Sequence, residues 1–181
     1  TSACCMRLRS TASAGSETLH GRATSVSAMD HRGEIENLLY QYAESIDAGD
    51  YDAIGVLFQH GCIADADGTP MAVGAQAVTG LYTATTRKYD DGTPRSHHVT
   101  SNLLIEISDD ERTATCRSRF TVFQQTDELP LQPIIAGAYT DSFERVDGKW
   151  RFTERRMRPS LYGDLSKHLL IEAMQTPDPR A

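Results

Sequence analysis

Apolar and polar side chains alternate along residues 112–125, and this alternation restricts the fold more than any other feature of the sequence. A strand with two such different faces is typical of an antiparallel sheet that buries one face. Asp147-Gly148 separates two further strand-like runs, 134–146 and 149–158, and Asp-Gly between strands strongly predicts a hairpin. The small or apolar residues of the first run are Ala114, Cys116, Ser118, Phe120 and Val122.

The segment before these strands has a helical pattern. Its first apolar stripe begins after Arg32 and recurs every three or four residues, which predicts an amphipathic helix. Gly49 suits a left-handed cap that ends this helix, and Asp50 suits the N-cap of a short second helix. The stripe consists of Ile35, Leu38, Leu39, Tyr42 and Ile46.

Three more elements complete the expected order. We expect a short strand at 61–67, a third helix at 75–88 and a long strand at 98–108. The sequence therefore predicts an α+β fold in which helices come first and a curved antiparallel sheet then wraps over the first helix as a cone-shaped half-barrel. Such a half-barrel leaves an apolar pocket suited to a small hydrophobic molecule.

Composition narrows the functional classes. The chain has 181 residues and a net charge of −7, which favours one soluble domain and disfavours a nucleic-acid partner. The longest uncharged apolar stretch, 129–139, is shorter than the ~20 residues that a membrane helix needs, so we expect no membrane partner. The cysteines lack the spacing of a zinc site or a disulfide scaffold, which fits a reduced cytoplasmic compartment. They are Cys4, Cys5, Cys62 and Cys116.

The chain divides into three segments. Residues 1–28 are rich in Ser, Thr, Ala and Arg and read as a disordered tail or an extension before Met29. The domain spans 29–164. The tail at 165–181 carries Leu165, Leu169 and Met174, whose spacing fits either a lid helix or an oligomer contact.

Four residues are candidates for chemistry: Tyr42, Asp47, His98 and Arg155. If Asp47 accepts a hydrogen bond from one ring nitrogen of His98, the other nitrogen is available as a general base for a proton next to a carbonyl or unsaturated group. Tyr42 and Arg155 would then stabilise developing oxyanion charge or protonate a leaving hydroxyl.

Each candidate also has an ordinary structural interpretation. Asp47 could simply end its helix, His98 and Tyr42 could belong to the core, and Arg155 could lie on a solvated edge. Tyr42 and Asp47 point about 140° apart on an ideal helix, so both reach one pocket only if the helix ends at Asp47. On a regular strand Arg155 faces outward, so it enters the pocket only if a bulge precedes it.

Other kinds of site are disfavoured. His97 and His98 are adjacent and point to opposite faces of a strand, so they cannot chelate one ion together. The sequence contains no phosphate-binding or dinucleotide-binding glycine loop and no GxSxG elbow. We therefore expect neither a metal nor a cofactor.

Two motifs carry a family resemblance over residues 34–164. The run from Tyr42 to Tyr51 (YAESIDAGDY) and the run from Tyr139 to Phe152 (YTDSFERVDGKWRF) resemble the first helix and the long hairpin of SnoaL-like domains in the nuclear transport factor two-like superfamily. The resemblance implies the cystatin-like fold inferred above. It leaves function open, since the superfamily contains isomerases, cyclases, dehydratases and non-catalytic subunits.

The site positions resemble one group within this superfamily. Asp47, His98 and Arg155 are similar to the site of hexachlorocyclohexane dehydrochlorinase, bile-acid dehydratase and, more distantly, scytalone dehydratase, where the histidine is the base of an elimination. Tyr42 replaces the lysine of the dehydrochlorinase, as in the bile-acid dehydratase, and this favours loss of water. The dehydratase's additional acidic residue has no evident counterpart here. The resemblance also implies a homotrimer, with a dimer as the alternative.

These observations together predict a cofactor-independent dehydratase for a hydrophobic, hydroxylated, polycyclic small molecule. One alternative is a ketosteroid-isomerase-like isomerase or a polyketide cyclase with Asp47 as the base. The other is a non-catalytic binding or assembly module, like the small subunits of ring-hydroxylating oxygenases. The residues expected to line the substrate pocket are Tyr82, Phe120, Phe123, Tyr139 and Met157.

Overall fold

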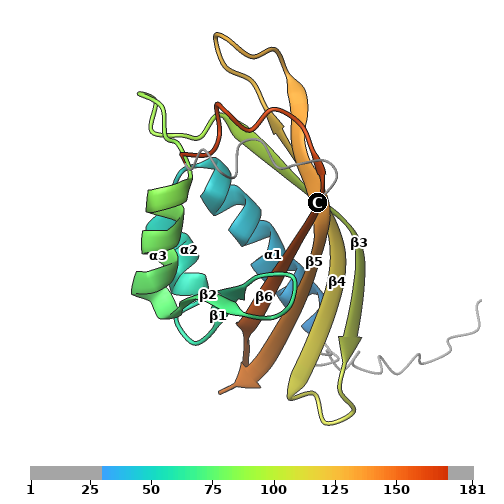
Figure 1. The fold of residues 1–181 in the computed structure, drawn as a ribbon. Helices are drawn as coiled ribbons and strands as arrows, with labels where there is room; N and C mark the ends of the chain where they lie inside the picture. Colours follow the sequence, from blue (N-terminus) through green and yellow to red (C-terminus); the bar gives the residue numbers. More distant parts are fainter. Residues whose placement is uncertain (1–29, 171–181) are drawn as a thin grey trace, which may run out of the picture.

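One curved sheet with its helices on a single face makes up residues 30–170, the part of the chain that the computed structural model describes (Figure 1). The helices are α1 (His31–Asp47), α2 (Tyr51–Leu57) and α3 (Gly74–Thr85). The strands are β1 (Cys62–Ala64), β2 (Pro70–Val73), β3 (Ser96–Ile107), β4 (Thr113–Gln124), β5 (Gln132–Val146) and β6 (Lys149–Tyr162).

The strand order in the sheet is β2-β1-β6-β5-β4-β3. Neighbouring strands are antiparallel except for β1 and β6, which are parallel. The edge strands β2 and β3 do not pair with each other, so the sheet stays open. The predicted α+β half-barrel, with helices followed by a curved and mostly antiparallel sheet, is confirmed.

The reversal between α1 and α2 follows from two residues. Gly49 has a φ of +70°, the left-handed conformation that glycine adopts without steric cost. The N–H of Asp50 donates to the carbonyl of Ser45 at 2.8 Å, and the Asp50 carboxylate then caps α2 by accepting from the N–H of Ala53 at 2.9 Å. Both predicted cap roles are confirmed, and α1 ends at Asp47.

A β-bulge in β6 decides which way Arg155 faces. Phe143 pairs with Phe152 and Ser142 pairs with Glu154, so Thr153 is an extra residue with no partner of its own. The extra residue reverses the alternation beyond it. Arg155 therefore shares the helix-covered face with Phe152, and both side chains are buried. Of the two outcomes that the sequence left open, the bulge is the one observed.

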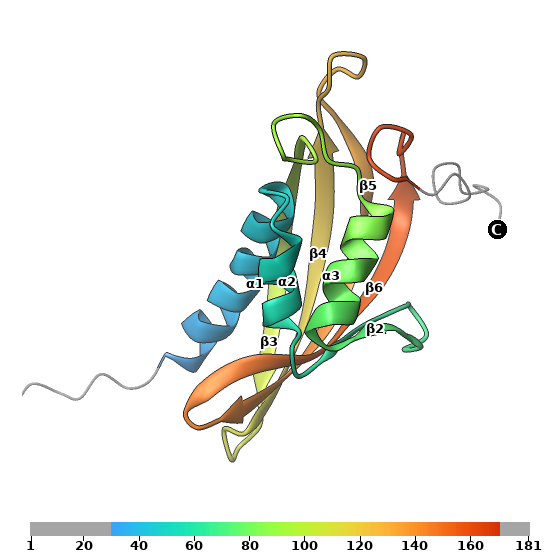
Figure 2. The ribbon, with the colours of Figure 1, turned by 90° about the vertical axis from the view of Figure 1, so that its left-hand side faces the viewer.

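The helices cover one face of the sheet (Figure 2), and the core consists of side chains from the helices and from that face. The buried residues of α1 are Ile35, Leu39, Tyr42 and Ile46, four of the five in the predicted stripe. Aromatic side chains pack between the helices and strands β5 and β6. The ring of Phe152 stacks on that of Phe58, with centroids 4.6 Å apart, and its centroid lies 4.7 Å from that of Phe143. This packing fixes α1 and α2 against β5 and β6.

Several predicted boundaries need correction. The strand expected at 61–67 is only β1, because Asp65 begins a turn that leads into β2, a strand that the sequence analysis missed. The third helix ends at Thr85 instead of 88. The last strand, expected to end at 158, continues to Tyr162 and pairs with β5 over that length.

The chain ends fall partly outside the description. Residues 1–28, Cys4, Cys5 and Met174 lie outside the described residues. Leu165 is buried, and residues 164–169 form turns and a single bridge from Leu169 to Thr86, so no helix begins at Leu165. Of the cysteines within residues 30–170, Cys116 is buried and Cys62 half-buried, and neither forms a disulfide. No helix in this range combines the length and apolar character needed to cross a bilayer.

Replacing Gly49 with alanine should destabilise the fold. A Cβ atom there would lie 2.3 Å from the carbonyl oxygen of Gly92, and its φ is positive, so we expect Gly49→Ala to lower the free energy of unfolding by more than about 1 kcal/mol in a urea titration. Gly80, in the exposed interior of α3, is the matched control because no atom lies within 4 Å of its added Cβ. Gly80→Ala should raise stability by about 0.5–1 kcal/mol. Effects of the same sign would contradict this account of the turn.

Candidate active site

Asp47 and His98 meet where the end of α1 contacts the start of β3. Oδ1 of Asp47 lies 2.6 Å from Nδ1 of His98, and its Oδ2 accepts a hydrogen bond from the backbone N–H of His98 at 2.8 Å. Ser96, two residues earlier on the same face of β3, donates from Oγ to Asp47 at 3.2 Å. The contact holds both the ring and the backbone of His98, and its side chain is only 5% exposed.

This geometry fixes the role of each ring nitrogen. An ionised carboxylate only accepts hydrogen bonds, so Nδ1 of His98 carries the hydrogen of this contact, and in the neutral imidazole Nε2 then carries the lone pair. Nε2 forms no hydrogen bond to any described residue. His98 is thus arranged as an oriented imidazole with a free basic nitrogen. The neighbouring His97 has a side chain that is 76% exposed, and its Nδ1 atom lies 3.8 Å from Oδ2 of Asp47.

A second buried histidine lies beside this pair. The ring centroid of His168 is 6.5 Å from that of His98, and Nδ1 of His168 has no hydrogen-bond partner. Burial and, secondarily, the nearby His98 lower the pKa of His168 to about 4, although Asp47 opposes the shift. His168 is therefore neutral near pH 7.

Tyrosine side chains form a second polar group in the core. The hydroxyls of Tyr42 and Tyr82 are 2.8 Å apart, and the Tyr42 ring contacts that of Tyr139 edge-on at 6.2 Å. Burial is the main reason that the pKa values of Tyr82 and Tyr139 lie well above the usual value. One hydroxyl of the Tyr42–Tyr82 pair donates to the other, which leaves one hydrogen for a further acceptor.

Arg155 is held in the core by a carboxylate and two rings. It donates from Nε and Nη2 to the two oxygens of Asp141, at 2.7 and 2.9 Å. Its guanidinium carbon lies 4.1 Å from the ring centroid of Tyr42 and 4.2 Å from that of Tyr139. Burial alone would lower the pKa of Arg155, but Asp141 raises it, and the net shift is upward. Nη1 is buried and has no partner.

The structure places the sequence-predicted residues in two groups. Asp47 and His98 form one, and Tyr42 and Arg155 form the other, with no hydrogen bond between the two groups within residues 30–170. Of the predicted pocket residues, Tyr82, Phe120, Tyr139 and Met157 face the interior, and the rings of Phe120 and Tyr139 stack at 4.3 Å.

Phe123 lies on the other side of the sheet. It alternates with Val122 and Gln124, which are 2% and 1% exposed, so its side chain faces away from the helices and beside His97. The expectation that it lines the pocket conflicts with this alternation, and we leave it out of the site.

Sequence reasoning missed three polar residues of the interior. Asp141 lies at every-second-residue spacing from Tyr139 and Phe143 and so shares their face of β5, which is a sufficient signal for an inward carboxylate. Ser96 precedes His98 by two residues and so shares its face. His168 gave no comparable signal, because it lies beyond the last strand, where no periodicity relates it to His98.

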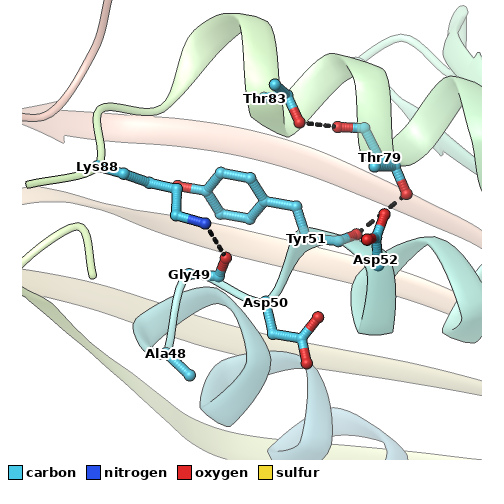
Figure 3. Close-up of a pocket in the computed structure, with 8 residues that line it drawn as sticks. All are labelled: Ala48, Gly49, Asp50, Tyr51, Asp52, Thr79, Thr83 and Lys88. Atoms are coloured by element: carbon cyan, nitrogen blue, oxygen red, sulfur yellow. Dashed lines mark hydrogen bonds between the residues drawn. The ribbon is translucent and has the colours of Figure 1, made fainter. Parts of the chain in front are cut away.

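A surface cleft beside the α1–α2 turn does not coincide with this interior. Among residues 30–170, no group of three His, Cys, Asp or Glu side chains could hold a metal ion. A cleft of about 330 Å³ opens on the outer side of the α1–α2 turn, where Lys88 donates to the carbonyl of Gly49 at 2.8 Å (Figure 3). Thr79 and Thr83, on α3, form the opposite wall, and their hydroxyls bond to backbone carbonyls. The bonds from Lys88 and Thr79 therefore hold the turn between α1 and α2.

The Asp141–Arg155 pair should dominate the electrostatic contribution to stability. Asp141→Asn leaves a buried guanidinium without its counter-charge, so we expect the free energy of unfolding to fall by about 3–5 kcal/mol in urea titrations. Glu144→Gln is the matched control, since Glu144 pairs with Arg151 at 2.8 Å on the half-exposed surface and should cost at most about 1 kcal/mol. Comparable losses for both would mean that burial of the first pair has no energetic consequence.

His168 should make the fold sensitive to acid. The pKa of His168 is lower in the folded than in the unfolded chain, so between about pH 6.5 and about pH 4 the unfolded state binds more protons. The free energy of unfolding therefore decreases as the pH is lowered through this range. His168→Gln should lose this dependence: relative to wild type, it should gain on the order of 2–3 kcal/mol between about pH 7 and about pH 4. Urea titrations across this range test the expectation, with the exposed His60→Gln as control. Parallel curves for wild type and His168→Gln would refute it.

Comparison with solved structures shows the same fold in several proteins. A protein from Novosphingobium aromaticivorans described as NTF2-like with a cystatin-like fold is 22% identical, with a TM-score of 0.58, over 78% of this chain and 90% of its own. A second protein from that organism, provisionally named a scytalone dehydratase, is 24% identical over 74% of this chain and 86% of its own, with a TM-score of 0.58. A Nostoc punctiforme protein of unknown function is 23% identical over 71% and 90%, with a TM-score of 0.57.

Sequence comparison identifies the family. The search of curated proteins gave no significant match. The sequence model of the SnoaL-like domain matches residues 27–156, which is most of the chain and includes α1, the sheet up to the middle of β6, Asp47, His98 and Arg155. The chain therefore belongs to the family of SnoaL-like domains.

Proposed function

We propose that this protein is a cofactor-independent dehydratase, a carbon–oxygen lyase that acts on a hydrophobic, hydroxylated, polycyclic small molecule. The observation that carries the proposal is the Asp47–His98 pair, with its 2.6 Å hydrogen bond and its nearly enclosed imidazole. Nε2 of His98 removes a proton from the carbon next to a carbonyl group. A carbon–carbon double bond forms as the neighbouring C–O bond breaks, and His98 returns its proton to the departing oxygen, so that water leaves.

The aromatic interior suits the substrate. Tyr42, Tyr82 and Tyr139 make this interior aromatic, and the Tyr42–Tyr82 hydroxyl pair has one hydrogen to donate to a carbonyl oxygen that gains charge during proton removal. Arg155 acts mainly on Tyr42 and Tyr139, because two of its nitrogens are committed to Asp141. Its cation favours negative charge at the neighbouring hydroxyls.

An isomerase or cyclase with Asp47 as the base is the second candidate within this family. The hydrogen bonds at Asp47 argue against it. Both carboxylate oxygens already accept from His98, and one also accepts from Ser96, so a proton taken by Asp47 would cost these bonds. A non-catalytic binding module does not require an aligned Asp–His pair with an unbonded imidazole nitrogen.

A hydroxylated tetralone provides the direct test, because this β-hydroxy ketone loses water to give a fluorescent naphthol. We expect wild type to form naphthol and His98→Ala to lose activity by about 10²–10⁴-fold, the usual contribution of a positioned base. Asp47→Asn should be impaired to a similar degree, since it no longer fixes the tautomer. Tyr42→Phe should lose less.

Controls distinguish the candidates. His60→Ala changes an exposed histidine outside the site and should retain full activity, while circular dichroism should show that every variant is folded. Substantial naphthol formation by His98→Ala together with its loss in Asp47→Asn would assign the base of the dehydration to Asp47 and overturn the role proposed for His98. Absence of turnover on fused β-hydroxy ketones of two, three and four rings would count against an enzymatic role.

A further inference from the structure

We propose that His168 is a second imidazole of the active site, which binds the hydroxyl oxygen that leaves the substrate. The inference rests on the proposed dehydratase function and adds a residue contributed by the segment beyond the last strand. It arises from a buried polar side chain that the rest of the fold does not use.

The position of His168 is firmly determined by its backbone. Its N–H donates to the carbonyl of Leu165 at 2.9 Å, and its carbonyl accepts from the N–H of Arg87, just beyond α3, at 2.8 Å. The preceding carbonyl, that of Lys167, accepts from the buried side chain of Gln124 at 3.1 Å and from the hydroxyl of Tyr89 at 2.7 Å. Leu169 forms a bridge to Thr86. These contacts fasten the segment across the end of the half-barrel where His98 lies.

The side chain of His168 has no equivalent anchor. Its Nδ1 atom is buried and has no hydrogen-bond partner among the described residues. A buried polar atom without a partner destabilises the fold, and such atoms are commonly satisfied by a bound ligand or water. The imidazole is therefore prepared for a hydrogen bond that the protein itself does not supply.

The distance to His98 indicates what lies between the rings. A direct N–H···N hydrogen bond would hold the two ring centroids about 5 Å apart, whereas the observed separation is 6.5 Å. The two imidazoles therefore do not bond directly, and the separation suits one oxygen atom bonded to both. That oxygen must also be the one that receives the proton from His98, which identifies it as the leaving hydroxyl.

The neutral state of His168 suits this role. The Asp47 carboxylate bonds to His98 and not to His168, so the proton that the reaction moves resides on His98 while His168 stays uncharged. A neutral imidazole offers its N–H to an oxygen that gains negative charge as the C–O bond breaks, without repelling the protonated His98. No further reactant is needed, because His168 neither gains nor loses a proton overall.

Ligand binding to a catalytically inactive protein tests the contact without depending on turnover. In the His98→Ala variant, we expect a hydroxylated tetralone to bind about ten-fold more tightly than the same tetralone without its hydroxyl, as measured by isothermal titration calorimetry. In the double variant His98→Ala/His168→Phe, which keeps an aromatic ring of similar size, this preference should disappear while the tetralone itself still binds. Equal affinities in the presence of His168, or failure of both compounds to bind, would overturn the assignment.

Kinetics of variants with His98 intact provide the second readout. His168→Phe should lower kcat/KM by about 10- to 100-fold, the effect of one hydrogen bond to a leaving oxygen, while His168→Asn should recover part of the loss through its amide N–H. His60→Phe is the control and should have wild-type kinetics. If His168→Phe folds and turns over like wild type, the inference is wrong. If the hydroxyl preference is present but wild type releases no naphthol, the dehydratase proposal fails and the His168 contact stands.

Discussion

The contact of Asp47 with His98 is the interaction on which the arrangement of the site depends. An aspartate at the C-terminus of a helix is electrostatically unfavourable, because the last carbonyl groups already carry negative partial charge, and no basic residue lies in the last turn of α1. Donors from β3 provide the compensation, since His98 donates twice and Ser96 once. The same bonds that make this position tolerable join the helix to the sheet and orient the imidazole.

The ion pair in the core is a second energetically unfavourable placement, after the aspartate at the C-terminus of α1. Arg155 and Asp141 are both essentially inaccessible, at 1% and 0% exposure, where apolar side chains of similar volume would be at least as stable. The bulge at Thr153 is what brings Arg155 inside, because without it the guanidinium would face the outer side of the sheet. Local conflicts of this kind concentrate at functional sites. Here Asp47 at the end of α1 and the Asp141–Arg155 pair on β5 and β6 lie on elements that border the same interior.

Much of the architecture was predictable because it rests on short-range signals. The stripe of α1, the Gly49-Asp50 reversal, the alternation in β4 and the Asp147-Gly148 hairpin each determine structure within a few residues. The strand β2 was missed because a four-residue edge strand has too few side chains to show a period. The sequence predicted an inward side chain for Arg155 only if a bulge precedes it, because the apolar pattern does not reveal a bulge. Phe123 was assigned to the pocket as an aromatic residue. It lies three residues after Phe120, and an odd spacing on a strand places the two side chains on opposite faces of the sheet.

The two histidines illustrate why the site could be only half predicted. His98 could be assigned from its position at the start of a strand near the end of a helix, but the environment of His168 arises from contacts of the last turns with α3 and Gln124, far apart in sequence. Their chemical difference has the same origin. The carboxylate reaches only His98, and burial without a carboxylate partner keeps His168 neutral. Two identical side chains acquire distinct roles when their surroundings separate their protonation, and here the tertiary placement of one carboxylate makes that separation.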